Sequence, residues 1–374
     1  MPLPTINYLT GVHFGVGSIG VLAEVLSDLG VTRPLVVTDR GLQDLGLVDR
    51  LGVKPAAVFA DVKTNPDEES AVAGVGIYHE YDCDGVVAVG GGSPIDCAKC
   101  ISLLVTHAEP LEQYAMIRGG VGRITSNKPP LVAIPTTAGT GSEVGRGALM
   151  TMQSGQKLAV ISPHIIPNVA ICDPELTREL PPLLTAATGL DAISHCVETF
   201  CSPKFNPVAE AIALDGLQRA WQNLPTAVQS GDNIAARGEM LMAALEGGLT
   251  FQKGLGLIHS LSHPLGALTH RRLHHGMLNA VFLPHVLRFN TDACPEKMRR
   301  MAEVAGVAVD AESLATAAHK LIESIGLPTR LRDMGVTQAD FDGIPAAAVA
   351  DHSTPTNPRT VTDADCLAML EAAF

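Results

Sequence analysis

The 374-residue chain lacks the features that nucleic-acid and membrane proteins share. It has 26 Lys and Arg against 39 Asp and Glu, and the basic residues are scattered along a chain of formal net charge -13. No window approaches the roughly 18 uninterrupted apolar residues of a membrane span. The N-terminus, Met1 to Pro4, has no basic segment followed by an apolar one. We therefore expect a soluble, unexported, cytoplasmic protein whose partner is a small molecule.

Cysteine is also sparse, with eight in the whole chain. This number is too low for a disulfide scaffold and favours a reducing compartment. Cys97 and Cys100 form a CxxC pair, but no second pair completes a zinc site, and the motif follows a glycine loop inside a helix-like run. The sequence predicts two buried thiols on a helix.

The chain is long enough for two domains, and 46% of its residues are hydrophobic, as in folded globular proteins. In the first half, apolar runs alternate with amphipathic stretches, a pattern typical of parallel βαβ units. Strands are expected at residues 34–39, 56–62, 85–89, 131–135 and 169–173, and helices at 20–29, 68–81 and 95–105.

After Pro181-Pro182 the composition changes to long Ala- and Leu-rich runs, and no internal repeat is apparent. Helices are expected within residues 183–200, 207–224, 234–268 and 363–373. The sequence thus predicts an α/β, Rossmann-like nucleotide-binding domain over residues 1–180 and an all-α domain over residues 181–374. Ligands of such sheets bind at the carboxyl ends of the strands, so the active site is expected in the cleft between the domains.

A glycine-rich loop follows the expected strand at 85–89 and opens a helix. Glycines let backbone amides approach a pyrophosphate, and the positive end of the helix dipole adds to the attraction. The spacing is not GxGxxG, and a tight structural turn is the alternative. The candidate cofactor-binding residues in this loop are Gly90, Gly91, Gly92, Ser93 and Asp96.

A second polar loop, PTTAGTGSE, also follows an expected strand and supports the same interpretation. Its hydroxyls can surround phosphate, ribose and nicotinamide; the alternative is a surface turn. Asp39 ends the first strand, where a carboxylate can bind the adenosine ribose and repel an added phosphate, which favours NAD, or can instead cap the next helix. The candidates in the loop are Thr136, Thr137, Thr140 and Ser142.

The second half contains a constellation of metal-ligand type. Asp191 and His195 lie four residues apart, on one face of an expected helix. His259 and His263 repeat that spacing, and His274-His275 follows. Unbonded imidazoles on apolar faces cost about 1–3 kcal/mol each, so a divalent metal explains the cluster better than five separate core histidines. Imidazoles with a carboxylate suit iron or zinc.

These motifs together resemble the iron-containing alcohol dehydrogenases. GGGSPID, PTTAGTGSE, TGLDAISHCVE, HSLSHPLGA and HGMLNAVFLPHVLRFN carry the resemblance, which runs along nearly the whole chain. It implies hydride transfer between a small alcohol or aldehyde and NAD, a dehydroquinate synthase-like architecture, iron rather than zinc, and a homo-oligomer. It also implies metal ligands at Asp191, His195, His259 and His275, a proton-moving role for His263, and Lys157 near the nicotinamide ribose.

Two departures from the family pattern lie near the substrate side: Gly145-Arg146-Gly147, and a loop before His275 that is two residues longer than is common. Arg271 and Arg272 in that loop could bind a substrate carboxylate or be solvated charges. A hydroxyacid-oxoacid transhydrogenase or 4-hydroxybutyrate-type dehydrogenase is the nearest rival, and a glycerol dehydrogenase fits less well. A catalytically silent nucleotide sensor is the rival outside enzymes, although such a protein does not need the metal ligands.

Overall fold

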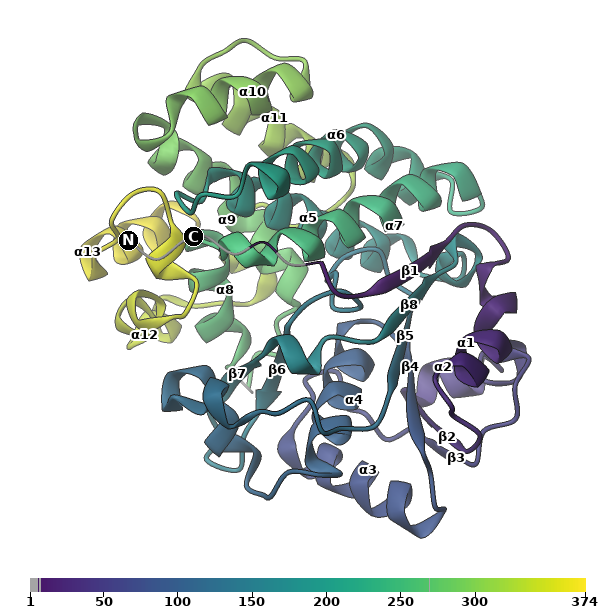
Figure 1. Cartoon of the computed structure of the whole chain (residues 1–374). Coiled ribbons are helices and arrows are strands. Elements are labelled where there is room, and N and C mark those ends of the chain that lie inside the picture. Colours follow the sequence, from purple (N-terminus) through teal and green to yellow (C-terminus); the bar gives the residue numbers. More distant parts are fainter. Residues whose placement is uncertain (1–5, 7, 269) are drawn as a thin grey trace. The chain divides into compact units, whose positions relative to one another are not determined.

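The computed structural model describes residues 6, 8–268 and 270–374, which form two compact units. One unit, Tyr8–Thr137 with Gly141–Arg178, contains a parallel sheet, and the other, Ala138–Thr140 with Glu179–Phe374, is helical (Figure 1). The expected combination of an α/β unit and a helical unit is thereby confirmed. Met1 to Pro4, on which the expectation of an unexported protein rests, lie outside the described residues.

The sheet has six strands in the order β1-β8-β5-β4-β2-β3, and every neighbouring pair is parallel. The strands are β1 (Gly11–Phe14), β2 (Pro34–Val37), β3 (Ala57–Phe59), β4 (Gly85–Gly90), β5 (Leu131–Pro135) and β8 (Val169–Cys172). Five of these were expected from the apolar runs, and β1 was not.

Both faces of the sheet are apolar, as a sheet covered by helices on both sides requires. Side chains alternate between faces along each strand, so Val87 and Val89 belong to one core cluster and Val86 and Ala88 to the other. The first cluster includes side chains of α1 (Leu22–Asp28), and the second includes those of α3 (Glu68–Glu80) and α4 (Gly92–Leu104). Cys97 and Cys100 are fully buried in α4, as expected.

An antiparallel pair, β6 (Gly147–Thr151) and β7 (Lys157–Ile161), was not expected from the sequence. Its first strand, GALMT, has one β-branched residue and no aromatic residue, which gives a weak strand signal. Burial alternates along both strands, so packing of one face stabilises the pair where propensity does not.

The helical unit is built around α5, which is buried along most of its length and packs against α6, α7 and α9. Within residues 234–268, where helices were expected, the structure has two helices, α7 and α8, with a break between them. After α7 the chain forms a short 3-10 helix, which ends at Gly254, a glycine with φ of +76°. The next helix, α8, begins at Leu257. The helices are α5 (Pro182–Cys201), α6 (Pro207–Gln229), α7 (Ile234–Leu249), α8 (Leu257–Gly266), α9 (His275–Asn290), α10 (Pro295–Ala305), α11 (Ala311–Ser324), α12 (Ile344–Ala350) and α13 (Asp363–Ala372).

None of the helices in the described part of the chain has the length and apolar character needed to cross a membrane.

Candidate functional site

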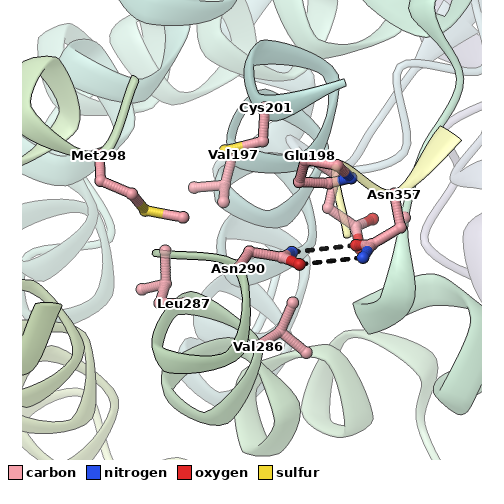
Figure 2. Close-up of a pocket in the computed structure, with 10 residues that line it drawn as sticks. Val197, Glu198, Cys201, Val286, Leu287, Asn290, Met298 and Asn357 are labelled. Carbon is pink, nitrogen blue, oxygen red and sulfur yellow. Dashed lines mark hydrogen bonds between the residues drawn. The ribbon is translucent and has the colours of Figure 1, made fainter. Parts of the chain in front are cut away.

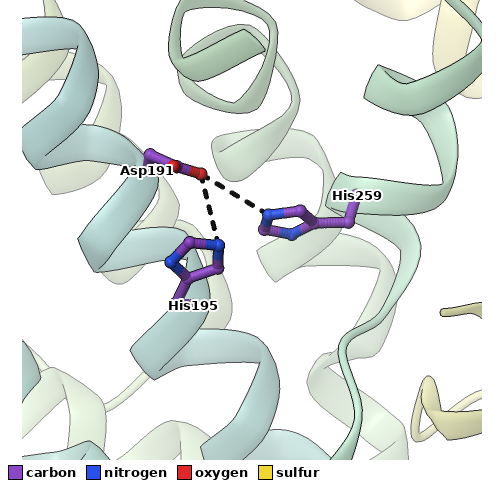
Figure 3. A group of neighbouring side chains, drawn as sticks. All are labelled: Asp191, His195 and His259. Atoms are coloured by element: carbon purple, nitrogen blue, oxygen red, sulfur yellow. Dashed lines mark ion pairs between the residues drawn. The ribbon is translucent and has the colours of Figure 1, made fainter. Parts of the chain in front are cut away.

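Three imidazoles converge on one carboxylate oxygen in the helical unit. The Nε2 atoms of His195, His259 and His275 lie 3.4, 3.5 and 3.5 Å from Oδ1 of Asp191. Figure 3 shows Asp191 and His195 on α5 facing His259 on α8. A tetrahedral ion with bonds of about 2.1 Å holds its ligand atoms about 3.4 Å apart, so these spacings fit a divalent metal.

Each of these imidazoles has another partner for its Nδ1 atom. Nδ1 of His259 is 2.5 Å from Oε2 of Glu198, and Nδ1 of His195 is 3.3 Å from the carbonyl oxygen of Gly139. Nδ1 of His275 is 3.4 Å from Oγ of Ser262. An acceptor at Nδ1 holds the proton there and leaves the Nε2 lone pair for a metal, an arrangement typical of metal-binding histidines.

The electrostatics of the cluster also favour a cation. Burial disfavours the ionised form of Asp191, but the imidazoles, His195 first, outweigh burial and hold the pKa of this carboxyl well below its usual range. Burial lowers the pKa of His195 to about 4, which keeps the ring neutral as a ligand. The amide nitrogen of Asn279 lies 2.8 Å from Oδ1 of Asp191, while its own Oδ1 is buried and has no hydrogen-bond partner among the described residues.

The close approach of α9 to α5 brings His275 to the cluster. A Cβ atom on Gly276 would lie 2.1 Å from the backbone oxygen of Ala187, so only glycine lets the first turn of α9 pack there. The neighbouring His274 is the N-cap residue of α9, and its Nδ1 is buried without a partner. The structure thus brings the imidazole of His275, and not that of His274, to Asp191.

Residues from distant parts of the chain hold the first turn of α8, which carries His259. Its N-cap, Gly256, has no capping side chain, and the amides of Leu257 and Ile258 donate to Asn357 (3.3 Å) and Glu198 (2.6 Å). Asn357 in turn exchanges two hydrogen bonds of 2.9 Å with Asn290 (Figure 2). The ring of His259 is therefore held through both its own Nδ1 and its backbone.

Glu198, Asn290 and Asn357 also line a small pocket, which Figure 2 shows. The predicted metal ligands are not among the residues that line it. The other lining residues are Val197, Cys201, Gly256, Val286, Leu287, Met298 and Pro358. Their largely apolar side chains make this pocket part of the packing behind the cluster.

His263, one helical turn after His259, lies beside the cluster and outside it. Its ring stacks on that of His275 at 5.5 Å, and its Nδ1 lies 2.9 Å from Oδ2 of Asp351. Glu198, Asn279 and Asp351 were not expected at the site from the sequence. Glu198 had a signal, because it lies seven residues after Asp191 on the same helix face. Asp351 had none, because only the fold brings it to α8.

The predicted cofactor residues of the α/β unit follow the ends of three neighbouring strands. Gly90 ends β4 with φ of +148°, Gly91 is the N-cap of α4, and Gly92, Ser93 and Asp96 belong to its first turns. Thr136 and Thr137 follow β5, and Asp39 follows β2. Thr140 falls in the helical unit by its contacts. Backbone amides at the start of α4 therefore lie where a pyrophosphate can bind.

Several of these side chains form hydrogen bonds with other residues of the α/β unit. Asp96 accepts from Oγ of Ser142 (2.5 Å) and from the amide of Leu149 (2.9 Å), and Ser142 accepts from the fully buried Nζ of Lys99 (2.7 Å). Asp39 caps α2 (Arg40–Asp44) by accepting from the amide of Leu42 at 3.0 Å. The alternative of a capping role for Asp39 is thus confirmed as one of its functions.

Lys157 and Arg271 have partners of their own. Lys157 lies in β7 and donates to Oδ1 of Asn65 at 3.1 Å. Arg271 forms a 2.8 Å ion pair with Asp340 and also donates to Thr337. A guanidinium held in this way is a poor candidate for a substrate carboxylate, which weakens that expectation for Arg271.

The whole chain matches one enzyme family. Residues 10–174 match the model of the iron-containing alcohol dehydrogenases, and residues 185–374 match that of the C-terminal part of the Fe-containing alcohol dehydrogenase family. The chain is 48% identical to a 4-hydroxybutyrate dehydrogenase of Cupriavidus necator, over 99% of both chains.

Two solved structures show the same architecture. A crystal structure of 1,3-propanediol oxidoreductase has a TM-score of 0.93 at 37% identity, covering 99% of this chain and 100% of that one. A sulfoacetaldehyde reductase of Bifidobacterium kashiwanohense, in complex with NAD+, has a TM-score of 0.90 at 29% identity, covering 100% and 99%. The chain therefore belongs to the iron-containing alcohol dehydrogenase family and is an oxidoreductase that transfers hydride between a small alcohol or aldehyde and a nicotinamide cofactor.

Proposed function

We propose that Asp191, His195, His259 and His275 bind one divalent metal ion, iron in preference to zinc. The observation that carries the proposal is the convergence of three Nε2 atoms on Oδ1 of Asp191 at 3.4–3.5 Å. The Nδ1 partners of the three rings support it, because they favour a ring proton on Nδ1 and a lone pair on Nε2. The Nε2 atoms of His259 and His275 also lie 3.3 and 3.2 Å from the amide nitrogen of Asn279. The family name favours iron, while the ligand chemistry suits both metals.

When bound there, the metal acts as a Lewis acid on the oxygen of an alcohol or aldehyde. His263 lies next to His275 and is 12% exposed, so it can contact a substrate oxygen. In alcohol oxidation it accepts a hydrogen bond from the substrate hydroxyl, which supports the loss of that proton. A nicotinamide cofactor, when bound, would supply the hydride acceptor for alcohol oxidation and the hydride donor for aldehyde reduction.

NAD is the proposed cofactor, bound by the loops that follow β4 and β5. The backbone at Gly90 to Ser93 binds the pyrophosphate, and Thr136, Thr137, Thr140 and Ser142 line the rest of the cofactor site. Asp39 favours NAD over NADP by repelling an added phosphate. Lys157 lies near the nicotinamide ribose. These assignments rest on the position of each residue in its motif and at its strand end.

The direct test measures turnover of a panel of primary alcohols by purified protein loaded with iron or with zinc. We expect NAD-dependent oxidation that requires the metal. A metal-loaded protein that binds NAD but turns over no alcohol or aldehyde would contradict the proposed reaction and favour a nucleotide-sensing role.

A hydroxy acid is the second candidate substrate, favoured by the 48% identity to a 4-hydroxybutyrate dehydrogenase over nearly the whole chain. Comparing kcat/KM for 4-hydroxybutyrate with that for butanol distinguishes the two. Selective use of the acid would identify a carboxylate-bearing substrate, and an Arg272→Ala variant would then show whether that side chain binds it.

We further propose a homo-oligomer in a reducing, cytoplasmic compartment. The edge strand β1 and its flanks expose Leu9, Val12 and Val16, apolar surface that a second copy could cover. All eight cysteines are free, and seven are buried, which suits a reducing environment. Light scattering of the purified protein measures the oligomeric state.

A further inference from the structure

Two histidines that lie one turn apart on α8 each pair with a carboxylate from another part of the chain. Glu198 pairs with Nδ1 of His259, and Asp351 pairs with Nδ1 of His263. In the first pair, the Nε2 atom faces the metal cluster. In the second, Nε2 has no hydrogen-bond partner within residues 6, 8–268 and 270–374, and the ring is partly exposed. In both pairs a carboxylate faces Nδ1 of a histidine, and in the second pair the Nε2 atom has no hydrogen-bond partner among the described residues.

Asp351 is held rigidly where it meets His263. It follows the last residue of α12, and its Oδ1 accepts a 2.8 Å hydrogen bond from the amide of Ser353 while its Oδ2 faces Nδ1 of His263. Burial disfavours its ionised form, but His263 outweighs this and holds the pKa of Asp351 well below its usual range. An ionised carboxylate only accepts hydrogen bonds, so Nδ1 of His263 must carry a proton.

The segment after Asp351 is fastened to α8 and to the residues just before it. Oγ1 of Thr354 lies 2.7 Å from Oγ of Ser260, and Oγ1 of Thr356 donates to the carbonyl oxygen of Leu255 at 2.6 Å. Asn357 accepts from the amide of Leu257. Because these contacts fix the backbone on both sides of the pair, the hydrogen bond between Asp351 and His263 has little freedom to rearrange.

Stacking fixes the plane of the His263 ring, and Asp351 fixes the ring orientation in which Nδ1 faces the carboxylate. The ring stacks on those of His275 and His352, at centroid distances of 5.5 and 5.4 Å and interplanar angles of 10° and 12°. Stacking alone would permit a half-turn of the ring about its bond to Cβ. The hydrogen bond to Asp351 selects one of the two orientations.

A second metal site formed by His263, Asp351 and His352 is the competing interpretation of this cluster. The 2.9 Å separation of Nδ1 and Oδ2 is that of a direct hydrogen bond. It is shorter than the 3.4–3.5 Å spacings around Asp191, which match the edges of a metal polyhedron. The geometry therefore favours a hydrogen-bonded pair.

We propose that Asp351 is a positioning residue for the reaction: it holds His263 as the tautomer with its proton on Nδ1, so that the Nε2 lone pair accepts a hydrogen bond from the substrate hydroxyl. This inference rests on the proposed role of His263 at the substrate. His352 stacks its ring on that of His263, and its Nδ1 lies 3.5 Å from Oδ1 of Asp351.

Asp351→Asn tests this directly, because Ser353 determines how the new amide is oriented. The amide oxygen must face the donating N–H of Ser353, so the amide NH₂ replaces Oδ2 and donates to Nδ1 of His263. His263 must then carry its proton on Nε2, which turns the acceptor at the substrate into a donor. The volume and the polar character of the side chain are retained.

The experiment combines nitrogen-15 NMR of the histidine rings in zinc-loaded protein with steady-state kinetics. His263→Gln identifies the signals of His263. In the parent we expect the Nδ1-protonated tautomer, and in Asp351→Asn the Nε2-protonated one. We expect kcat to fall by about 10²- to 10⁴-fold, the range for losing a positioned acid–base group, with a smaller change in KM and one metal ion per chain retained. Asp342→Asn, on an exposed carboxylate, is the matched control and should change neither tautomer nor kcat.

Three results would overturn the proposal: an Nε2-protonated His263 in the parent, an unchanged kcat in Asp351→Asn despite a reversed tautomer, or a loss of one of two bound metal ions in that variant. The tautomer in the parent is measurable even if Asp351→Asn fails to fold. A parent that shows the expected tautomer but oxidises no alcohol would contradict the proposed function and leave the positioning by Asp351 intact.

Discussion

In the helical unit, three imidazole Nε2 atoms point at one oxygen of Asp191, whereas in the α/β unit several of the predicted cofactor side chains bond to other residues of that unit. The carboxylate of Asp96 is occupied by Ser142 and Leu149, and that of Asp39 caps α2. The two motifs therefore work differently. In the metal motif the side chains themselves are the proposed ligands, while in the proposed nucleotide motif many side chains hold the backbone in place.

The largest expected effect, and the sharpest test of this difference, is on the metal cluster. Asp191→Ala removes the carboxylate on which all three imidazoles converge, so we expect loss of both bound metal and turnover. Elemental analysis and NAD-dependent alcohol oxidation measure the two. His319→Ala, on a partly exposed histidine of α11, is the control and should retain both. Full metal content in Asp191→Ala would show that Asp191 is not needed to bind the metal and would contradict the proposed site.

The next effect concerns Glu198, which contacts the proposed metal ligand His259 and is not itself a proposed ligand. Glu198→Gln weakens the hold on Nδ1 of His259 and on the first turn of α8, so metal affinity should fall by about 10- to 100-fold. Competition with a chelator measures the affinity. Glu371→Gln, an exposed change in the same unit, should leave it unaltered. Equal affinities in the two variants would confine Glu198 to a structural role.

In the α/β unit, the corresponding change should affect stability and leave the metal in place. Asp96→Asn replaces one of the two oxygens that accept from Ser142 and Leu149 by an NH₂ group, and it leaves the charge of the buried Lys99 less compensated. We expect the free energy of unfolding to fall by about 1–3 kcal/mol, with unchanged metal content. Denaturant unfolding tests this, with Asp44→Asn, an exposed change in that unit, as the control. Loss of the metal without a lower free energy of unfolding would contradict the view that Asp96 stabilises the α/β unit and does not affect the metal site.

The smallest expected effect is on cofactor choice, which we propose Asp39 influences in addition to capping α2. Asp39→Asn keeps a good N-cap and removes the charge, so NADP use relative to NAD should rise by about tenfold, equivalent to about 1.4 kcal/mol. Asp39→Gly should raise it similarly and cost only a few tenths of a kcal/mol in stability. The ratio of kcat/KM values for the two cofactors measures it. A parent that already prefers NADP would contradict the assignment.

Sequence reasoning succeeded where local pattern and structure coincide. Buried strands such as β4 and β5 have continuous apolar runs, and Asp191 with His195 has the spacing of one helix face. It failed where the determining contact is remote. The break at Gly254 lies inside a run with helical composition, and β6 depends on packing. Likewise, Asp351 meets His263 across 88 residues, a proximity that no local motif encodes.

The choice between His274 and His275 lies between these extremes. The position before Gly276 predicts His275, and the packing of that glycine on Ala187 supplies the physical reason. The longer loop upstream could not be interpreted from the sequence, because its length alone does not say which ring turns inward. Part of that loop, residue 269, lies outside the described residues.

X-ray absorption at the metal K edge of the loaded protein tests the central claim, a metal ion bound by Asp191 and three imidazoles, most directly. The account predicts one ion per chain with three imidazole nitrogens in its first coordination shell, falling to two in His275→Ala and remaining three in His274→Ala. A first shell of oxygen atoms alone, or an unchanged imidazole count in His275→Ala, would contradict it.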